Sequence, residues 1–259
     1  MKQALMTGIF ILLASVVIFL IAWPILNTVT SAPMDVLWET LQDREVLRVI
    51  TFTFYSSLIA TGVAFLVGIP LAYLLARKDF PGKAVLEGLI DLPIVIPHSA
   101  AGIALLITFG RRSALGSIFG KLGISFVSSP AGVVLAMFFV SVPFLIDSAR
   151  EGFEGVDPAL EFVSRSLGAS SWGAFRKVSF PLAWRSILSG LIMMWARGIS
   201  EFGAVVILAY NPMIAPVLLY ERFQAYGLDY AVPVATLVLL ISIIVFTILR
   251  TIHSQGADR

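Results

Sequence analysis

The stretch REGFEGVDPALEFVSRSLGASSWGAFRKVSFPLA, residues 150–183, separates two long apolar segments and decides how the rest of the chain is interpreted. In its first half, Asp157 can cap a helix that begins at Pro158, where the missing N–H of proline costs nothing. Gly168 can adopt the positive φ that ends such a helix. The pattern predicts a short capped helix followed by a glycine turn.

A second short helix is predicted after this turn. Ser170 or Ser171 can cap it, and Pro181 is expected to end it, because proline lacks the N–H that continues a helix. In a chain otherwise built for lipid, such a helix pair on the water side needs a partner outside the membrane.

The faces of the first helix differ in character. Glu161 and Arg165 are spaced as an i,i+4 ion pair on one face. Another face carries four residues that are mostly apolar: Phe162, Val163, Ser166 and Leu167.

The composition is that of a membrane protein. Hydrophobic residues make up 58% of the 259 residues and charged residues 13%, and the mean hydropathy of +0.94 is not tolerated by a water-soluble domain. A helix that crosses a ~30 Å hydrocarbon core needs about 20 apolar residues. The sequence predicts an all-α membrane protein with six transmembrane helices, at about 5–27, 52–76, 88–109, 130–149, 185–209 and 230–251.

The first apolar run is expected to be a span and not a cleaved signal peptide. From Leu5 to Leu26 it is longer than the apolar region of a signal peptide, and no small-x-small cleavage site closes it. The chain has no cysteine, which excludes disulfides, thiolate metal sites and cysteine nucleophiles.

The distribution of lysine and arginine favours a topology with both termini in the cytoplasm. This topology places eleven cations inside: Lys2, Arg77, Lys78, Lys83, Arg150, Arg165, Arg176, Lys177, Arg185, Arg250 and Arg259. It leaves six outside: Arg44, Arg48, Arg111, Arg112, Lys121 and Arg222. The loop at 150–184 is then cytoplasmic.

Small residues and prolines recur in the spans. Small side chains spaced by four let membrane helices approach closely, at Ala60, Ala64 and Gly68 and at Ala196, Ser200 and Ala204. Four prolines inside or near spans can bend a helix: Pro70, Pro93, Pro97 and Pro143.

Arg197 and Glu201 are charged residues inside a predicted span. They lie one turn apart and can offset each other, as a pair that faces other helices or as a pair beside a translocation path. His98 is interpreted as a packed polar residue, and Asp91 and Asp147 are expected to hydrogen-bond to neighbours or helix termini.

The loop resembles the cytoplasmic "EAA" loop of ABC-importer permeases. Gly168, nine residues and Val178-Ser179-Phe180-Pro181 match that family's Gly, nine residues and Ile-x-Leu-Pro. The family's Glu-Ala-Ala would fall on Phe162, Val163 and Ser164, so Glu161 lies one residue early. The resemblance implies that the loop docks into an ATPase subunit through Asp157, Ala159, Glu161, Phe162, Val163, Arg165, Ser166, Leu167, Gly168 and Ala169.

Further stretches resemble one branch of these permeases. Residues 68–77, GIPLAYLLAR, look like the end of the family's second span. LPIVIP at 92–97 with FGRR at 109–112 resembles the molybdate and tungstate branch, and EFGA at 201–204 is shared by molybdate and sulfate permeases. The resemblance covers about residues 55–210.

This resemblance implies the function of the chain and its partners. Residues 1–259 would form a single ABC-importer-type transmembrane domain with a coupling helix pair between spans 4 and 5, for import of a tetrahedral oxyanion. The implied partners are a second copy of the chain, two ABC ATPase subunits, an extracytoplasmic oxyanion-binding protein and membrane lipid. ATP and magnesium would bind the ATPase subunit, and this chain would carry no cofactor.

The alternatives are a sulfate or thiosulfate permease of the same kind, or an ATP-independent, ion-coupled carrier. Enzyme motifs are not found: residues 116–122, GSIFGKL, have one residue too few between the glycines for a P-loop. His98 and His253 make no HExxH zinc motif and no Ser–His pair. The basic residues are scattered, so nucleic-acid binding is not expected. No catalytic or metal site is predicted.

Overall fold

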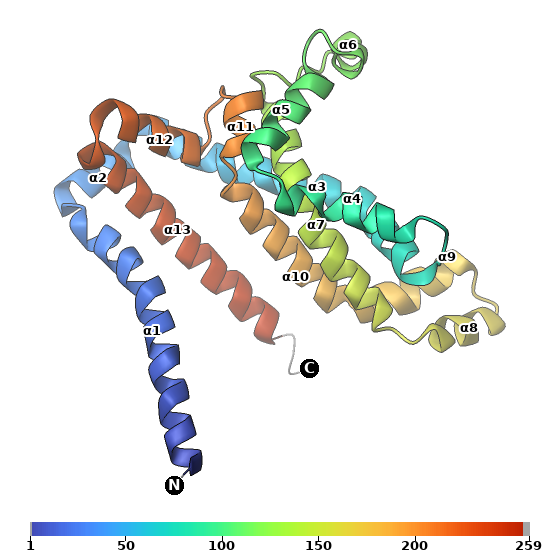
Figure 1. Cartoon of the computed structure of the whole chain (residues 1–259). Helices are drawn as coiled ribbons and strands as arrows, with labels where there is room; N and C mark the ends of the chain where they lie inside the picture. Colours follow the sequence, from blue (N-terminus) through green and yellow to red (C-terminus); the bar gives the residue numbers. More distant parts are fainter. Residues whose placement is uncertain (1, 256–259) are drawn as a thin grey trace. The chain divides into compact units, whose positions relative to one another are not determined.

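The computed structural model describes residues 2–255, and the side chains of residues 5–249 and 251. Arg259, which the charge distribution assigns to the cytoplasm, lies outside the described residues, as do the side chains of Lys2, Arg250 and His253. All regular elements of the described part are helices, which confirms the all-α prediction (Figure 1). They are α1 (Lys2–Ser31), α2 (Met34–Gln42), α3 (Arg44–Arg77), α4 (Lys83–Val95), α5 (His98–Phe109), α6 (Ala114–Lys121), α7 (Pro130–Glu154), α8 (Pro158–Ser166), α9 (Ser171–Ala174), the π-helix η1 (Phe175–Ser179), α10 (Phe180–Ile199), α11 (Gly203–Leu208), α12 (Ala215–Tyr226) and α13 (Leu228–Gln255).

Five stretches of helix are long and apolar enough to cross a membrane, among the residues that the structure describes. They are Leu5–Ser31, Arg44–Arg77, Pro130–Glu154, Ser171–Ile199 and Leu228–Leu249. These confirm four of the six predicted spans in position, 5–27, 52–76, 130–149 and 230–251, each of which lies inside a longer helix.

The predicted third span, 88–109, is wrong as a single helix. α4 ends at Val95, α5 begins at His98, and the two are bent by 115°. Pro97 cannot donate an N–H, and its ring disfavours the helical conformation at Ile96, which is extended with φ −71° and ψ 146°. The pair reaches membrane length only when both helices are counted together.

The predicted fifth span, 185–209, is shifted in the structure. Its helix begins at Ser171 and ends at Ile199, and a break separates it from α11. Pro181 does not end the second loop helix, because the π-helical turn Phe175–Ser179 directly before it accommodates the missing hydrogen bond and the chain continues as α10.

The chain divides into two compact units. In the first, which contains residues up to Ile50 and Leu218–Ile248, Arg222 Nη2 contacts Asp43 Oδ2 at 2.8 Å, between α12 and the start of α3. Within this unit, most apolar side chains of α1 are exposed.

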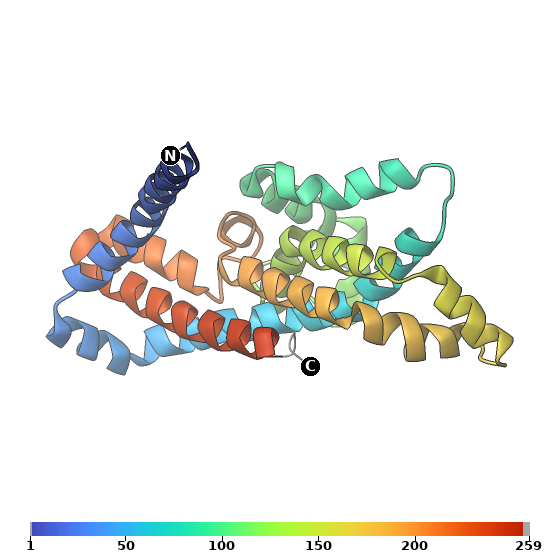
Figure 2. The same cartoon turned by 90° about the horizontal axis from the view of Figure 1, so that it is seen from below.

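The second unit, built on Thr51–Val217, holds the main core. α7 packs along α10 on one side and against α4 on the other (Figure 2). One half of the core joins Ala72 and Leu75 of α3, Leu145 and Phe153 of α7, and Ile187 of α10, all fully buried. The other half joins α5, α7 and α11 around Leu105, Met137 and Leu208. This packing fixes the two places where functional side chains gather.

Candidate functional site

The capped helix and glycine turn predicted in the 150–183 stretch are present as α8. Asp157 Oδ1 accepts a hydrogen bond from Ala159 N at 2.8 Å, and Pro158 is in the first turn. Gly168 has φ +93°, and Ser170 caps the following helix, α9. These features confirm the predicted helix start and glycine turn. Both could be predicted because each depends only on residues adjacent in sequence.

Glu161 anchors α8 to two other helices. Its carboxylate accepts hydrogen bonds from Tyr73 Oη at 2.8 Å, Arg77 Nε at 2.7 Å and Ser179 Oγ at 2.6 Å. Arg77 Nη2 also donates to the carbonyl of Val156, just before α8, at 2.9 Å. The end of α3 and the π-helical turn are therefore tied to α8 through one carboxylate.

The surroundings of Glu161 favour its charged form. Burial raises the pKa of this carboxyl, but hydrogen bonds from Ser179, Tyr73 and Arg77, together with the Arg77 charge, outweigh burial and bring the pKa below its ordinary value. The anchor is thus an ionised carboxylate at neutral pH.

The predicted Glu161–Arg165 pair is wrong. Glu161 is turned toward Arg77, and Arg165 is exposed. An exposed i,i+4 pair contributes about 0.2–0.5 kcal/mol, whereas a hydrogen bond to a charged group contributes about 1.5–3 kcal/mol. The three-donor site around Arg77 therefore outcompetes the local pair.

The outer face of α8 is apolar and unpartnered in the described chain. Phe162 is 63% exposed, Val163 57% and Leu167 84%, and Leu160 is also exposed. Burying one such side chain is worth about 1.5–3 kcal/mol. Burial of this face against a partner would therefore contribute a large favourable free energy of binding.

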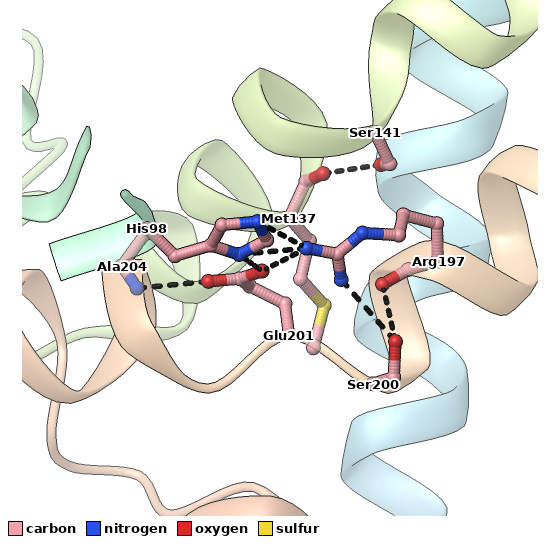
Figure 3. A network of polar contacts seen from close by, with 7 residues as sticks. All are labelled: His98, Met137, Ser141, Arg197, Ser200, Glu201 and Ala204. Atoms are coloured by element: carbon pink, nitrogen blue, oxygen red, sulfur yellow. Dashed lines mark hydrogen bonds and ion pairs between the residues drawn. The ribbon is translucent and has the colours of Figure 1, made fainter. Parts of the chain in front are cut away.

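The second site lies where the break between α4 and α5 meets the break between α10 and α11 (Figure 3). Glu201 is fully buried, and its Oε1 accepts a hydrogen bond from Ala204 N at 2.8 Å, which caps the first turn of α11. The break before α11 removes the backbone carbonyl that would accept from Ala204 N in a continuous helix. The Glu201 carboxylate takes its place.

Two basic side chains contact the other oxygen of this carboxylate. Arg197 Nη2 lies 3.1 Å from Glu201 Oε2, which confirms the predicted contact one turn away. His98 Nδ1 lies 2.6 Å from the same oxygen, and Arg197 Nη2 lies 2.6 and 2.7 Å from the two ring nitrogens of His98. Arg197 Nη1 also donates to Ser200 Oγ at 3.2 Å.

Two glycines allow α5 and α11 to approach this closely. A Cβ on Gly203 would lie 2.7 Å from the Cβ of His98, and a Cβ on Gly102 would lie 2.9 Å from the Cα of Ala204. Both distances are too short for real side chains, so the contact between His98 and Glu201 requires glycine at both positions.

The sequence favours a packed polar role for His98, whereas in the structure its ring contacts both Glu201 and Arg197. Its side chain is 34% exposed and that of Arg197 is 23% exposed, while the carboxylate beneath them is fully buried. The available signal was its position directly after Pro97, where a broken helix turns the first side chain of α5 toward another element.

A third polar group joins α4 to α7. Arg150 Nη1 contacts Glu87 Oε1 at 2.7 Å, and Arg150 Nη2 lies 3.7 Å from Asp147 Oδ1. Asp147 thus contacts a neighbouring side chain, whereas Asp91 Oδ1 is buried without a hydrogen-bond partner among the described residues.

Comparisons with known proteins place this geometry in a family. The family of binding-protein-dependent transport system inner membrane components matches residues 68–259. The molybdate/tungstate transport system permease protein WtpB of Thermococcus kodakarensis is 46% identical over 220 residues, which cover 85% of this chain and 84% of the relative. A probable sulfate transport system permease protein cysT of Marchantia polymorpha is 35% identical over 231 residues, 86% of this chain and 80% of the relative.

The fold is shared with solved importers. The structure of a bacterial ABC transporter involved in import of the acidic polysaccharide alginate matches with a TM-score of 0.73 at 14% identity, covering 98% of this chain and 96% of that one. The same kind of transporter in complex with an alginate pentasaccharide-bound periplasmic protein matches with a TM-score of 0.70 at 16% identity, covering 93% and 91%. The chain belongs to the binding-protein-dependent transport system inner membrane component family and is a multi-pass membrane transport subunit.

Proposed function

We propose that this chain is the permease subunit of an ATP-driven importer for a tetrahedral oxyanion, molybdate or tungstate. The observation that supports this choice of substrate is the 46% identity to a molybdate/tungstate permease over most of both chains. The more distant likeness to a sulfate permease, at 35% identity, keeps sulfate as the second candidate.

The coupling element of this proposal is α8 with its glycine turn. Its exposed apolar residues (Phe162, Val163 and Leu167) would dock into a groove of an ABC ATPase subunit, with Arg165 and Ser166 at the same surface. Asp157, Ala159, Gly168 and Ala169 hold the ends of the helix, and Glu161 would pass its displacement to α3 and to the π-helical turn η1 that leads into α10. Closure of the ATPase pair would then bias the spans between inward-open and outward-open states.

The partners follow from this assignment. A second copy of the chain would complete the translocation path, and two ATPase subunits would bind ATP and magnesium. An extracytoplasmic binding protein would deliver the oxyanion. The chain itself would carry out no covalent chemistry and hold no cofactor, and residues 1–259 would act as one transmembrane domain.

The orientation follows from α7. α6 precedes its first residue and α8 follows its last, so they lie at opposite ends of one 25-residue helix (Figure 1). A helix of this length rises about 36 Å and crosses the membrane. If α8 meets an ATPase, α8 is cytoplasmic and α6 is extracytoplasmic. With six spans, including the bent α4–α5 pair as one, both termini would then be cytoplasmic.

The network of His98, Arg197 and Glu201 is proposed to line the translocation path or its gate. Its basic side chains are partly exposed while the carboxylate is buried, so an anion would meet the basic groups first. Glu201 offsets the charge of Arg197, which would keep an oxyanion from binding too tightly to leave.

Copurification and crosslinking test the proposal. The native chain has no cysteine, so single cysteines can be placed at Ala159 or Ser166 without background. Both are expected to crosslink to the ATPase subunit, while a cysteine at Ser117, beyond the other end of α7, is expected not to. Absence of both crosslinks in an assembled complex would contradict the docking assignment.

A further inference from the structure

The segment around α6 carries positive charge without acidic residues. Between Asp91 and Asp147 the sequence contains Arg111, Arg112 and Lys121 but no aspartate or glutamate. All three cations are exposed, and none makes an ion pair within the described residues. An unpaired basic surface of this kind is available to an anionic partner.

This segment is held in one shape. Ser113 Oγ caps α6 by accepting from Gly116 N at 2.9 Å, and its hydroxyl reaches the carbonyl of Thr108 at 2.6 Å. Three aromatic rings connect α6 to its flanks, with centroids 5.1–6.3 Å apart: Phe119 of α6, Phe109 at the end of α5, and Phe126 before α7. The segment that contains α6 therefore forms a structured platform between the end of α5 and the start of α7.

A cavity of about 500 Å³ opens on this platform. Arg111 and Lys121 line it together with the hydroxyl-bearing Ser117 and Ser125, and the rings of Phe109 and Phe126 form its apolar part. The cavity thus combines two cations, two hydroxyl groups and an aromatic wall.

We propose that this Arg111–Lys121 cavity receives an acidic side chain projecting from the extracytoplasmic binding protein. This inference rests on the proposed function, because it needs α6 to be extracytoplasmic and the importer to have such a partner. Charge complementarity selects an anionic group, and the aromatic wall selects a group carried on an apolar stem. A free tetrahedral oxyanion fits less well, since it is much smaller than the cavity and gains nothing from the aromatic wall.

Complementary charge across an interface speeds encounter and fixes orientation, and its effect falls with salt. The cavity would therefore position the binding protein over the platform before its cargo is released. It would act on docking of the partner and not on recognition of the cargo.

The test uses the complete transporter with its ATPase subunits in lipid nanodiscs, and the molybdate-loaded binding protein of the same organism as probe. R111E combined with K121E is expected to weaken binding of the probe at least tenfold at low salt and to flatten the salt dependence of its Kd. S117W, which fills the cavity without changing charge, is expected to weaken binding as well. R44E combined with R48E reverses the same number of exposed cations on the same predicted side. This charge-matched control is expected to bind the probe with nearly the wild-type Kd.

The possible results separate this inference from the proposed function. An unchanged Kd in both cavity variants would overturn the inference. An equal loss in R44E/R48E would also overturn it, because it would indicate a general charge effect. A raised KM for molybdate with an unchanged Kd for the binding protein would also overturn it, in favour of direct anion capture. If the wild-type transporter binds no molybdate-loaded protein at all, the proposed function itself fails.

Discussion

The fully buried carboxylate of Glu201 lies 2.6 Å from Nδ1 of His98, a residue 103 positions earlier in the chain. One residue follows the break between α4 and α5, and the other lies in the break between α10 and α11. The contact therefore joins two interrupted helices at their breaks, where the backbone hydrogen bonds of neither helix are continuous. A movement at one break must either carry the other with it or separate the buried carboxylate from its partner.

Replacing His98 is expected to loosen this connection. H98A leaves Glu201 with Arg197 and Ala204 N as partners, and removing one partner of a buried group costs about 1–3 kcal/mol. We expect a lower thermal unfolding temperature and a loss of transport, with the complex still assembled. H98Q, which retains a hydrogen-bond donor, should recover part of the stability; equal stability of wild type and H98A would contradict the role given to this contact.

The Arg197–Glu201 pair should show strong coupling. E201Q leaves the guanidinium without its counter-charge. Because Arg197 is partly exposed, the loss is expected to be smaller than the about 3–5 kcal/mol for breaking a fully buried pair. The double variant R197M/E201Q removes both charges and is expected to be more stable than E201Q. Denaturation of the four proteins of this cycle measures the coupling, and additive losses would show that the two residues do not interact.

Loss of the Glu161 anchor should uncouple α8 from the spans. E161A removes the acceptor shared by Tyr73, Arg77 and Ser179, so ATP hydrolysis is expected to persist while transport falls at least tenfold. Asp79, an exposed carboxylate two residues after Arg77 that pairs with Lys83, provides the control: D79A should transport normally. Normal transport by E161A would show that α8 is held by other contacts.

The same anchor predicts a pH dependence. Because the pKa of Glu161 in the folded state is below its ordinary value of 4.5, the anchor stabilises the fold at pH values above that range. This stabilisation is lost as the pH falls through the lowered pKa, where the carboxylate takes up a proton. Unfolding midpoints measured between neutral and acidic pH should therefore fall less steeply for E161Q than for wild type.

The glycine turn and the apolar face of α8 give a further pair of variants. A β-branched residue at Gly168, where φ is +93°, costs about 1–3 kcal/mol, and F162D places a charge on the proposed docking face. Both G168V and F162D are expected to insert normally but to lose transport-coupled ATP hydrolysis. G168N, which tolerates positive φ, and F162L, which remains apolar, should retain it.

How much was predictable depends on whether a feature is local. The cap at Asp157 and the turn at Gly168 depend on adjacent residues, and both were predicted correctly. Prolines show the limit: Pro70 and Pro143 lie inside continuous helices, whereas Pro97 separates α4 from α5. Local sequence does not distinguish these cases, because packing of the surrounding helices decides whether a helix continues past a proline.

Contacts across long separations were not predictable from one sequence. Glu161 has a suitable partner four residues away in Arg165, yet it bonds to Arg77, 84 residues earlier. His98 likewise meets Glu201 only because Gly102 and Gly203 let α5 and α11 approach. Both contacts depend on tertiary packing that leaves no periodic pattern in the sequence.

Uptake into proteoliposomes tests the central claim most directly. The permease would be reconstituted with its ATPase subunits and the molybdate-binding protein, and accumulation of molybdate would be followed with ATP on the ATPase side. The account predicts uptake that requires both ATP and the binding protein, is competed by tungstate, and is little affected by sulfate. Uptake that proceeds without ATP and follows an imposed proton or sodium gradient would contradict it.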